Sequence, residues 1–284
     1  MFSSVPSYFH SLIAFLTSIL TSLALLICPT PAPTDTAVIT SERCYSLVES
    51  YLTGQGLDSE DGYYYSSGAI SAFSIGGLAK IDMATGEIVA QNIFALPNEF
   101  RQKDYDHIGD LAVQNGIIYA PVEDVAEKYP LILLYDAETL EYTGTYYEMD
   151  ATYLTDGIPW CAVDENYLYA SPINHPEKIA AFNLDDMTLS HTIDITEPIH
   201  RVQAGDCFDG KLYLNVDSRE GNKKVYVVDL ETGDTSFLYD RNISGFDMEA
   251  EGLCVTADEN GELIFHHSDY NKIVSTFIRT YKLK

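Results

Sequence analysis

Carboxylate side chains recur at corresponding places along the chain, each near the start of a short segment rich in β-branched and aromatic residues. Four of them would be brought to one axis by a repeating fold: Asp110, Asp206, Glu249 and Glu251. Carboxylates held close together cannot all stay ionised without a cation, and oxygen ligands favour the hard ion Ca²⁺. The spacing of Glu249 and Glu251 places both on one side of a regular strand. These residues therefore predict a calcium (Ca) site with the four carboxylates as metal ligands.

Other polar and aromatic side chains at equivalent positions could contact an organic ligand: Gln55, His107, Trp160, Gln203 and His267. Trp160 is the single tryptophan, and it could either stack on a ligand or fill the core. The run His266-His267-Ser268-Asp269 has the letters of a nucleophilic triad, but successive strand residues point to opposite faces. The polar residues could instead only hydrogen-bond the loops between strands, and this alternative stays open.

A sequence repeat must position these residues. A tyrosine that follows a hairpin turn recurs at a spacing of roughly 45 to 55 residues, which is typical of propeller blades; it is Tyr65, Tyr119, Tyr169 and Tyr213. Turn dipeptides keep the same period: Asp61-Gly62, Asn115-Gly116, Glu165-Asn166, Asp209-Gly210 and Asn260-Gly261. A second hairpin turn, as at residues 82–86 and 229–233, recurs with the same period. Three markers in phase predict repeated blades of four strands.

The repeat predicts an all-β fold, a five-bladed β-propeller with four-stranded antiparallel blades, over residues 43–284. The last copy, from Glu251 onward, supplies only three strands. Residues 44–53 precede the first copy, and we expect them to be the fourth strand of the last blade. This N-terminal strand would close the ring and remove both free sheet edges. Deleting residues 44–53 is then expected to unfold the ring.

The N-terminal part of the chain has a different character. Residues 12–28 are an apolar run that prolines follow, and the run is shorter than the roughly 20 residues that a spanning helix needs. We therefore interpret residues 1–28 as a cleaved signal peptide, with an uncleaved signal anchor as the alternative because basic residues are missing before the run. Residues 29–42 are interpreted as a Pro/Thr-rich linker. The protein is expected to be secreted or extracytoplasmic, and to meet a membrane only through this segment.

The charge excludes one class of partner. The chain has 43 acidic and 16 basic residues, a formal net charge of −27, and no basic stripe for phosphate binding, so we expect no nucleic acid partner. A small molecule or peptide is the expected ligand, and a monomer the expected state.

Four cysteines follow the apolar run: Cys44, Cys161, Cys207 and Cys254. They are expected to be buried free thiols, with disulfides as the alternative.

Residues 52–57 are Leu-Thr-Gly-Gln-Gly-Leu, residues 64–68 are Tyr-Tyr-Ser-Ser-Gly, and residues 77–88 form the second hairpin. This first copy resembles the opening blade of the glutamine cyclotransferase family, whose five-bladed propellers cyclise an N-terminal glutamine to pyroglutamate. The resemblance implies the fold for the whole ring. It implies a site role for Gln55 and, with a shifted residue, for Trp160. The family's second-blade Glu-Gly-Leu is replaced by Gly109-Asp110-Leu111, and its Asn-Glu-Leu-Glu by residues 204–207.

Three functional hypotheses follow. The first is an extracytoplasmic propeller whose acidic axial site binds Ca²⁺ and a small ligand or peptide. The second is a glutaminyl-peptide cyclotransferase-like enzyme, in which Glu251 or Asp110 is the general base and Trp160 a pocket wall. The third is a metal-dependent hydrolase or glycoside hydrolase that uses two of the catalytic candidates Asp110, Asp206 and Glu251.

Overall fold

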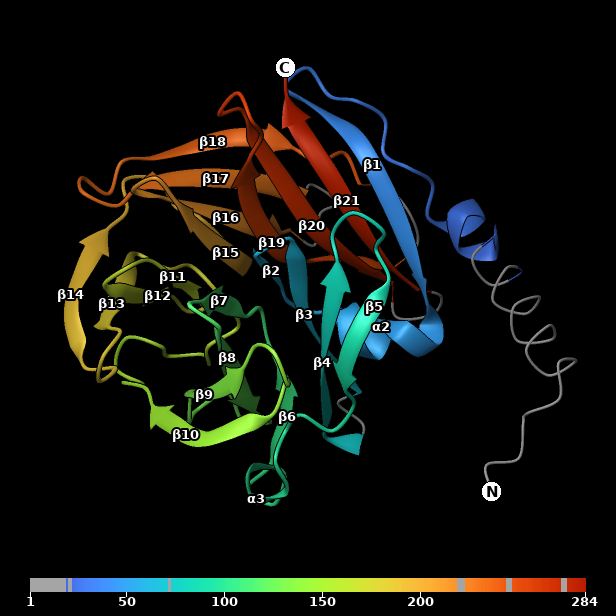
Figure 1. The fold of residues 1–284 in the computed structure, drawn as a ribbon. Helices are drawn as coiled ribbons and strands as arrows, with labels where there is room; N and C mark the ends of the chain where they lie inside the picture. The colour runs from blue at the N-terminus through green and yellow to red at the C-terminus, as the bar shows by residue number, and fades with distance from the viewer. Residues whose placement is uncertain (1–18, 20–21, 71–72, 219–222, 244–246, 272–274) are drawn as a thin grey trace, which may run out of the picture.

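A computed structural model describes residues 19, 22–70, 73–218, 223–243, 247–271 and 275–284. Its strands form five antiparallel sheets, the blades, set around a common axis (Figure 1). The predicted five-bladed β-propeller is therefore confirmed. Blade 1 consists, from the axis outward, of β2 (Leu57–Glu60), β3 (Tyr63–Ile70), β4 (Ile75–Asp82) and β5 (Ile88–Asn92).

The innermost strand of blade 2 is interrupted, because two short strands pair with the same neighbour. The strands of this blade are β6 (Tyr105–Ile108), β7 (Ala112–Gln114), β8 (Ile117–Asp124), β9 (Leu131–Asp136) and β10 (Tyr142–Glu148). Blade 3 has the strands β11 (Ala162–Val163), β12 (Tyr167–Ala170), β13 (Lys178–Asn183) and β14 (Leu189–Asp194). Blade 4 has β15 (Val202–Phe208), β16 (Lys211–Asp217), β17 (Lys223–Asp229) and β18 (Thr235–Asp240).

Blade 5 contains both ends of the described ring. It consists of β19 (Met248–Ala257), β20 (Leu263–Asn271), β21 (Ser275–Leu283) and β1 (Ala37–Ser46). β1 pairs with β21 along its whole length, from Ala37 opposite Leu283 to Ser46 opposite Ser275. The predicted closure of the last blade by an N-terminal strand is thus confirmed, and Figure 1 shows this strand along the outer edge of the blade.

The predicted bounds of the closing strand, residues 44–53, are wrong. The strand ends at Ser46, and residues Leu47–Thr53 form the helix α2. The Glu49 carboxylate accepts hydrogen bonds from the Ser46 backbone N–H at 2.8 Å and from its hydroxyl at 2.7 Å, which favours a helix start at this point. At the other end, the β-branched residues 38–40 extend the strand into the segment predicted as linker.

The repeated tyrosines fill the spaces between blades. Each belongs to the apolar cluster between its own blade and the next, and the four are at most 9% exposed: Tyr65, Tyr119, Tyr169 and Tyr213. Three of the four two-residue turns before them have the predicted positive φ, for example 53° at Asn115 and 75° at Gly116. The turn before Tyr169, Glu165-Asn166, does not have it. The period seen in the sequence therefore reflects the contact of each blade with its neighbour.

Glycine permits the blades to meet at the axis. A methyl group added to Gly252 of β19 would lie 2.5 Å from the backbone nitrogen of Leu57 in β2. One added to Gly109 would lie 2.3 Å from the Pro159 carbonyl oxygen in blade 3. Gly56 and Gly205 are as tightly enclosed. The inner strands therefore approach so closely that a Cβ atom does not fit between them.

Among the described residues, no helix is long and apolar enough to cross a membrane. Most of the apolar run predicted as a signal segment, at residues 12–18 and 20–21, lies outside the described part of the chain. The five cysteines are free thiols.

We predict that Gly252→Ala lowers the free energy of unfolding by about 1–3 kcal/mol or more, because the added methyl group overpacks the contact between blades 5 and 1. Denaturant titration of the purified protein measures this. Gly116→Asn is the control, because nothing lies within 4 Å of a Cβ atom there and asparagine tolerates the φ of 75°. Equal stability of Gly252→Ala and the wild type would refute the close approach.

Candidate functional site

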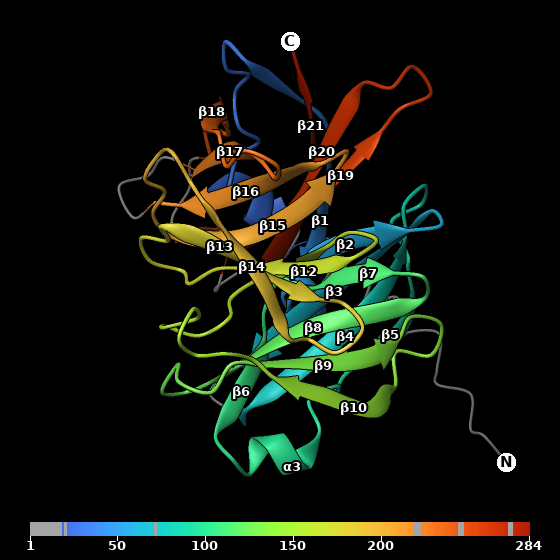
Figure 2. The ribbon, with the colours of Figure 1, turned by 90° about the vertical axis from the view of Figure 1, so that its left-hand side faces the viewer.

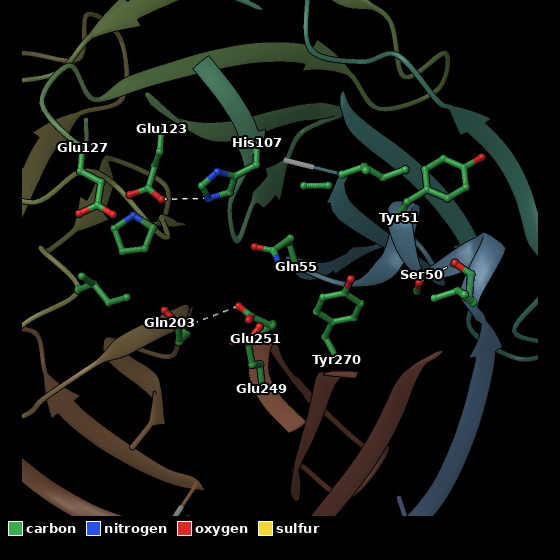
Figure 3. Close-up of a pocket in the computed structure, with 15 residues that line it drawn as sticks. Ser50, Tyr51, Gln55, His107, Glu123, Glu127, Gln203, Glu249, Glu251 and Tyr270 are labelled. Atoms are coloured by element: carbon green, nitrogen blue, oxygen red, sulfur yellow. Dashed lines mark hydrogen bonds and ion pairs between the residues drawn. The ribbon is translucent and has the colours of Figure 1, made fainter. Parts of the chain in front are cut away.

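All five blades contribute to a cavity of about 910 Å³ at one end of the axis (Figure 3). Its polar lining comes from the starts of the inner strands, from β8 and β20, and from the loops between strands: Gln55, His107, Glu123, Glu127, Gln203, Glu249, Glu251 and Tyr270. Apolar side chains complete the wall, among them Ile70 of blade 1 and Pro159 and Ile173 of blade 3. The helix α2 adds Leu47, Ser50 and Tyr51. The cavity volume is that of a small-molecule site.

The cavity is acidic on two sides. Glu123 and Glu127 of blade 2 lie across the cavity from Glu249 and Glu251 of blade 5 (Figure 3). Both Glu249 and Glu251 reach the cavity, as strand periodicity predicted. Burial raises the pKa of Glu127, and the nearby carboxylate of Glu123 raises it further. The described lining residues include no lysine or arginine.

His107 is the one cationic group among the described lining residues. It lies opposite Glu123 in the pairing of β6 with β8, and its Nε2 is 3.1 Å from a Glu123 carboxylate oxygen. Its Nδ1 is 2.7 Å from a carboxylate oxygen of Asp106. Burial lowers the pKa of His107, but the hydrogen bonds to Asp106 and Glu123 outweigh burial and raise this pKa to about 10. The imidazole is therefore protonated at neutral pH and compensates part of the charge of Glu123.

Glu251 is held by the lining residue Gln203 and by groups behind the cavity wall. The Gln203 side chain donates to the Glu251 carboxylate at 3.4 Å, and the Asn215 amide donates to the Glu251 carbonyl at 3.0 Å. Arg241 in turn donates to the Asn215 side-chain oxygen at 3.0 Å. The Asp269 carboxylate pairs with Arg241 and with Arg279, and Arg279 also pairs with Glu42 of β1.

Five predicted site residues are brought together in this cavity: Gln55, His107, Gln203, Glu249 and Glu251. Trp160 and His267 are not among its lining residues, and both are fully buried. Trp160 packs in the apolar cluster between blades 3 and 4, so the core role is the one that the structure gives it. The His267 Nε2 hydrogen-bonds the Tyr239 hydroxyl at 2.6 Å, and burial lowers the pKa of His267 well below its usual value.

Asp110 links blades rather than lining the cavity. It is 2% exposed, and its two carboxylate oxygens accept the backbone N–H groups of Leu57 at 2.9 Å and of Gly205 at 3.0 Å. Its backbone N–H donates to the Pro159 carbonyl at 2.9 Å. One residue of blade 2 thus joins blades 1, 3 and 4. Burial raises the pKa of Asp110, although the two amide donors lower it in part.

Asp206 belongs to a different group, deeper in the ring. One carboxylate oxygen accepts the Val255 N–H at 2.6 Å, and an oxygen of Asp206 lies within 4.8 Å of ligand atoms of Asp58 and Cys254. Burial raises the pKa of Asp58, Asp206 and Cys254. Among the described residues, this is the one group whose ligand atoms are close enough to hold a metal ion. The four predicted metal ligands are therefore not gathered at one point.

Several lining residues could not be predicted from the sequence. Tyr51 reaches the cavity because it lies on α2, a segment predicted as a strand. Glu127 lies in the loop after β8 and has a φ of 54°, a conformation that period-based analysis does not anticipate. The residues at the starts of the inner strands were the ones that could be predicted to line the cavity, because those positions supply most of the polar lining.

The fold and the site define a class of protein, a five-bladed β-propeller with an acidic axial cavity. No protein-family model matches the chain, and no curated protein does. A bifunctional GH43-CE protein from Bacteroides eggerthii is similar in structure, with a TM-score of 0.54 and 12% identity over 84% of this chain and 34% of that one. The exo-β-1,3-galactanase from Phanerochaete chrysosporium has a TM-score of 0.54 and 10% identity, over 86% of this chain and 64% of that one.

This chain spans less than two thirds of the length of either of these proteins. Similarity at such low identity shows the propeller fold alone. The resemblance of the first blade to glutamine cyclotransferases remains a prediction.

We predict that Asp110→Asn destabilises the fold by about 1–3 kcal/mol, because the side-chain amide keeps one acceptor oxygen and leaves a buried N–H group unpaired. Denaturant titration measures the loss. Glu231→Gln, on an exposed turn of blade 4, is the control and should leave the free energy of unfolding nearly unchanged. A stable Asp110→Asn protein would show that Asp110 does not join the blades.

His107→Gln should reduce stability by about 1–3 kcal/mol, because it removes a charged hydrogen-bond donor. The ionised imidazole stabilises the fold fully below its usual pKa of about 6.5, and this contribution is lost as the pH rises toward the folded-state pKa of about 10. The difference in unfolding free energy from the wild type is thus expected to be largest near pH 6 and to shrink toward pH 10. A difference that grows with pH would contradict the assignment.

Proposed function

We propose that this protein is a ligand-binding β-propeller whose axial cavity binds an organic cation, a compound with a protonated amine and an apolar body. The observation that carries the proposal is the placement of glutamates on two sides of one cavity, Glu123 and Glu127 opposite Glu249 and Glu251. An amine between them would be attracted by both sides. Tyr51, Ile70 and Ile173 would contact the apolar body.

The four cavity carboxylates are on two sides of the cavity, and this separation favours an organic cation over a calcium ion as the ligand. Calcium takes 6–8 oxygen ligands at 2.3–2.6 Å, which requires several ligand atoms around one point. The cavity carboxylates do not form such a group in the described part of the chain. Calcium at Glu249 and Glu251, with water completing its shell, is the second candidate, because these two side chains come from one strand and reach the same cavity.

A peptide with an N-terminal glutamine is one such organic cation. Gln55, Gln203 and Glu251 line the same cavity. The amine and the side-chain carboxamide of the peptide's N-terminal glutamine would therefore lie beside Glu251, the candidate general base. The glycoside hydrolase alternative has less support. Two of its three candidate carboxylates, Asp110 and Asp206, accept backbone N–H groups of neighbouring inner strands and lie outside the cavity lining.

Isothermal titration of the full chain tests the proposal with three probes. They are hexylamine, the dipeptide amide Gln-Ala-NH₂ and calcium chloride, the last on protein first treated with a chelator. Hexanol and the N-acetylated dipeptide are the matched uncharged controls. We expect the amines to bind and their uncharged counterparts not to bind, and the dipeptide is also assayed for pyroglutamate formation.

The double variant Glu249→Gln and Glu251→Gln should weaken amine binding about tenfold or more, since removing the two carboxylates costs about 1.4 kcal/mol or more of attraction. Glu231→Gln, on an exposed turn of blade 4, makes the same kind of charge change and should have no effect. Binding of calcium without binding of amines would favour the second candidate. Equal binding of amines and their neutral counterparts would refute the proposal.

A further inference from the structure

A second cavity, of about 360 Å³, lies at the outer part of blade 2. We call it the α3 pocket, and its charged and aromatic side chains come mainly from three places. The short helix α3 (Asn98–Arg101) and the residues after it give Phe100 and Lys103, the loop between β8 and β9 gives Lys128 and Tyr129, and β10 gives Tyr146. Figures 1 and 2 both show α3 at the periphery near β6 and β10. The pocket shares no lining residue with the axial cavity.

Aromatic rings form one wall of the α3 pocket. Phe100 is 1% exposed and packs edge to face on Tyr105 at 6.0 Å and on Tyr146 at 5.1 Å between ring centroids. Tyr146 is 41% exposed and Tyr129 is 67% exposed. A rigid, buried ring thus supports aromatic groups that remain open to solvent, which is an arrangement suited to stacking on a flat molecule.

The loop that carries Lys128 and Tyr129 is held in place by backbone hydrogen bonds. One carboxylate oxygen of the buried Asp124 accepts the N–H groups of Lys128 and Tyr129, both at 2.8 Å. The Tyr105 hydroxyl donates to the Tyr129 carbonyl at 2.9 Å. The pocket is therefore formed before any ligand arrives, and binding need not order this loop.

The charge of the α3 pocket is opposite to that of the axial cavity. Lys103 and Lys128 have no acidic partner among the described residues, whereas other lysines pair with carboxylates, such as Lys80 with Glu138 and Lys178 with Asp194. The Lys103 ammonium is 5.7 Å from the centroid of the Phe100 ring. Glu148 is the one acidic residue of the described lining. In a chain with 43 acidic and 16 basic residues, the two lysines give this aromatic pocket a local positive charge.

We propose that the α3 pocket is a second binding site, which takes a ring compound bearing a carboxylate. The apolar face of the ring would stack on Tyr129 or Tyr146, and the carboxylate would lie between Lys103 and Lys128. The volume of about 360 Å³ suits one or two rings. A hexuronic acid and an aromatic acid share this chemistry, a ring with an apolar face and a carboxylate, and the experiment separates them.

The test is titration of the full chain, followed by NMR or calorimetry, with two pairs of probes at low salt. Glucuronate is compared with glucose, and benzoate with benzyl alcohol, so that each pair differs in the carboxylate. We expect an acid to bind more tightly than its neutral partner and to bind less tightly as salt is added. Preference for glucuronate identifies a sugar acid as the ligand class, and preference for benzoate an aromatic acid.

The double variant Lys103→Gln and Lys128→Gln should weaken acid binding about fivefold to tenfold, which corresponds to somewhat under 1 kcal/mol per lysine. Tyr146→Ala should weaken the acid and the neutral probe alike. Lys211→Gln is the matched control, since Lys211 pairs with Asp229 on blade 4, and it should change nothing. All variants are first checked for an unchanged melting temperature.

The proposal is overturned if neither acid binds, or if the double lysine variant binds them as the wild type does. This inference does not depend on the axial cavity. The Glu249→Gln and Glu251→Gln protein should bind the acids normally, so failure at one site is distinguishable from failure at the other.

Discussion

Five inner strands converge on one axis, and the space between them is too narrow for a Cβ atom at several points. Gly252 meets Leu57, and Gly109 meets Pro159, at distances that only glycine permits. Asp110 has its side chain between the inner strands, and it accepts the backbone N–H groups of Leu57 in blade 1 and Gly205 in blade 4. The axial cavity lies at the strand starts, where loops replace this close packing, and the polar side chains there face solvent and one another.

The fold could be predicted because its signals are local. A two-residue turn such as Asn115-Gly116 and the tyrosine that follows it lie within a few residues, and their period follows from contacts between successive blades. The cavity could be predicted in part, since Gln55, Gln203 and Glu251 occupy equivalent strand starts. The roles of Asp110 and Trp160 could not. Alternation in a strand gives two faces, but it does not tell which face meets the backbone of another blade.

A network of buried charged side chains joins the closing strand β1 to the residues that support Glu251 in the axial cavity. Glu42 on the closing strand pairs with Arg279, which shares Asp269 with Arg241, and Arg241 reaches Asn215 behind Glu251. Arg241, Arg279 and Asp269 are fully buried. Such pairs recover little more than their desolvation cost, but the loss of one partner leaves a buried charge without compensation. The network therefore fixes the closing strand in one register and supports the backbone at Glu251.

The same closing strand has a consequence for biosynthesis. β1 leaves the ribosome before the other strands of the ring, whereas its partner β21 is the last strand of the ring to leave. The contact of Thr40 with Thr280 spans 240 positions. At about 5–20 residues per second, translation keeps the two apart for on the order of ten to fifty seconds. During that time β1 is an unpaired strand edge, open to neighbouring nascent chains. The last blade, and with it the Glu249 and Glu251 side of the cavity, is completed only after β21 has been synthesised.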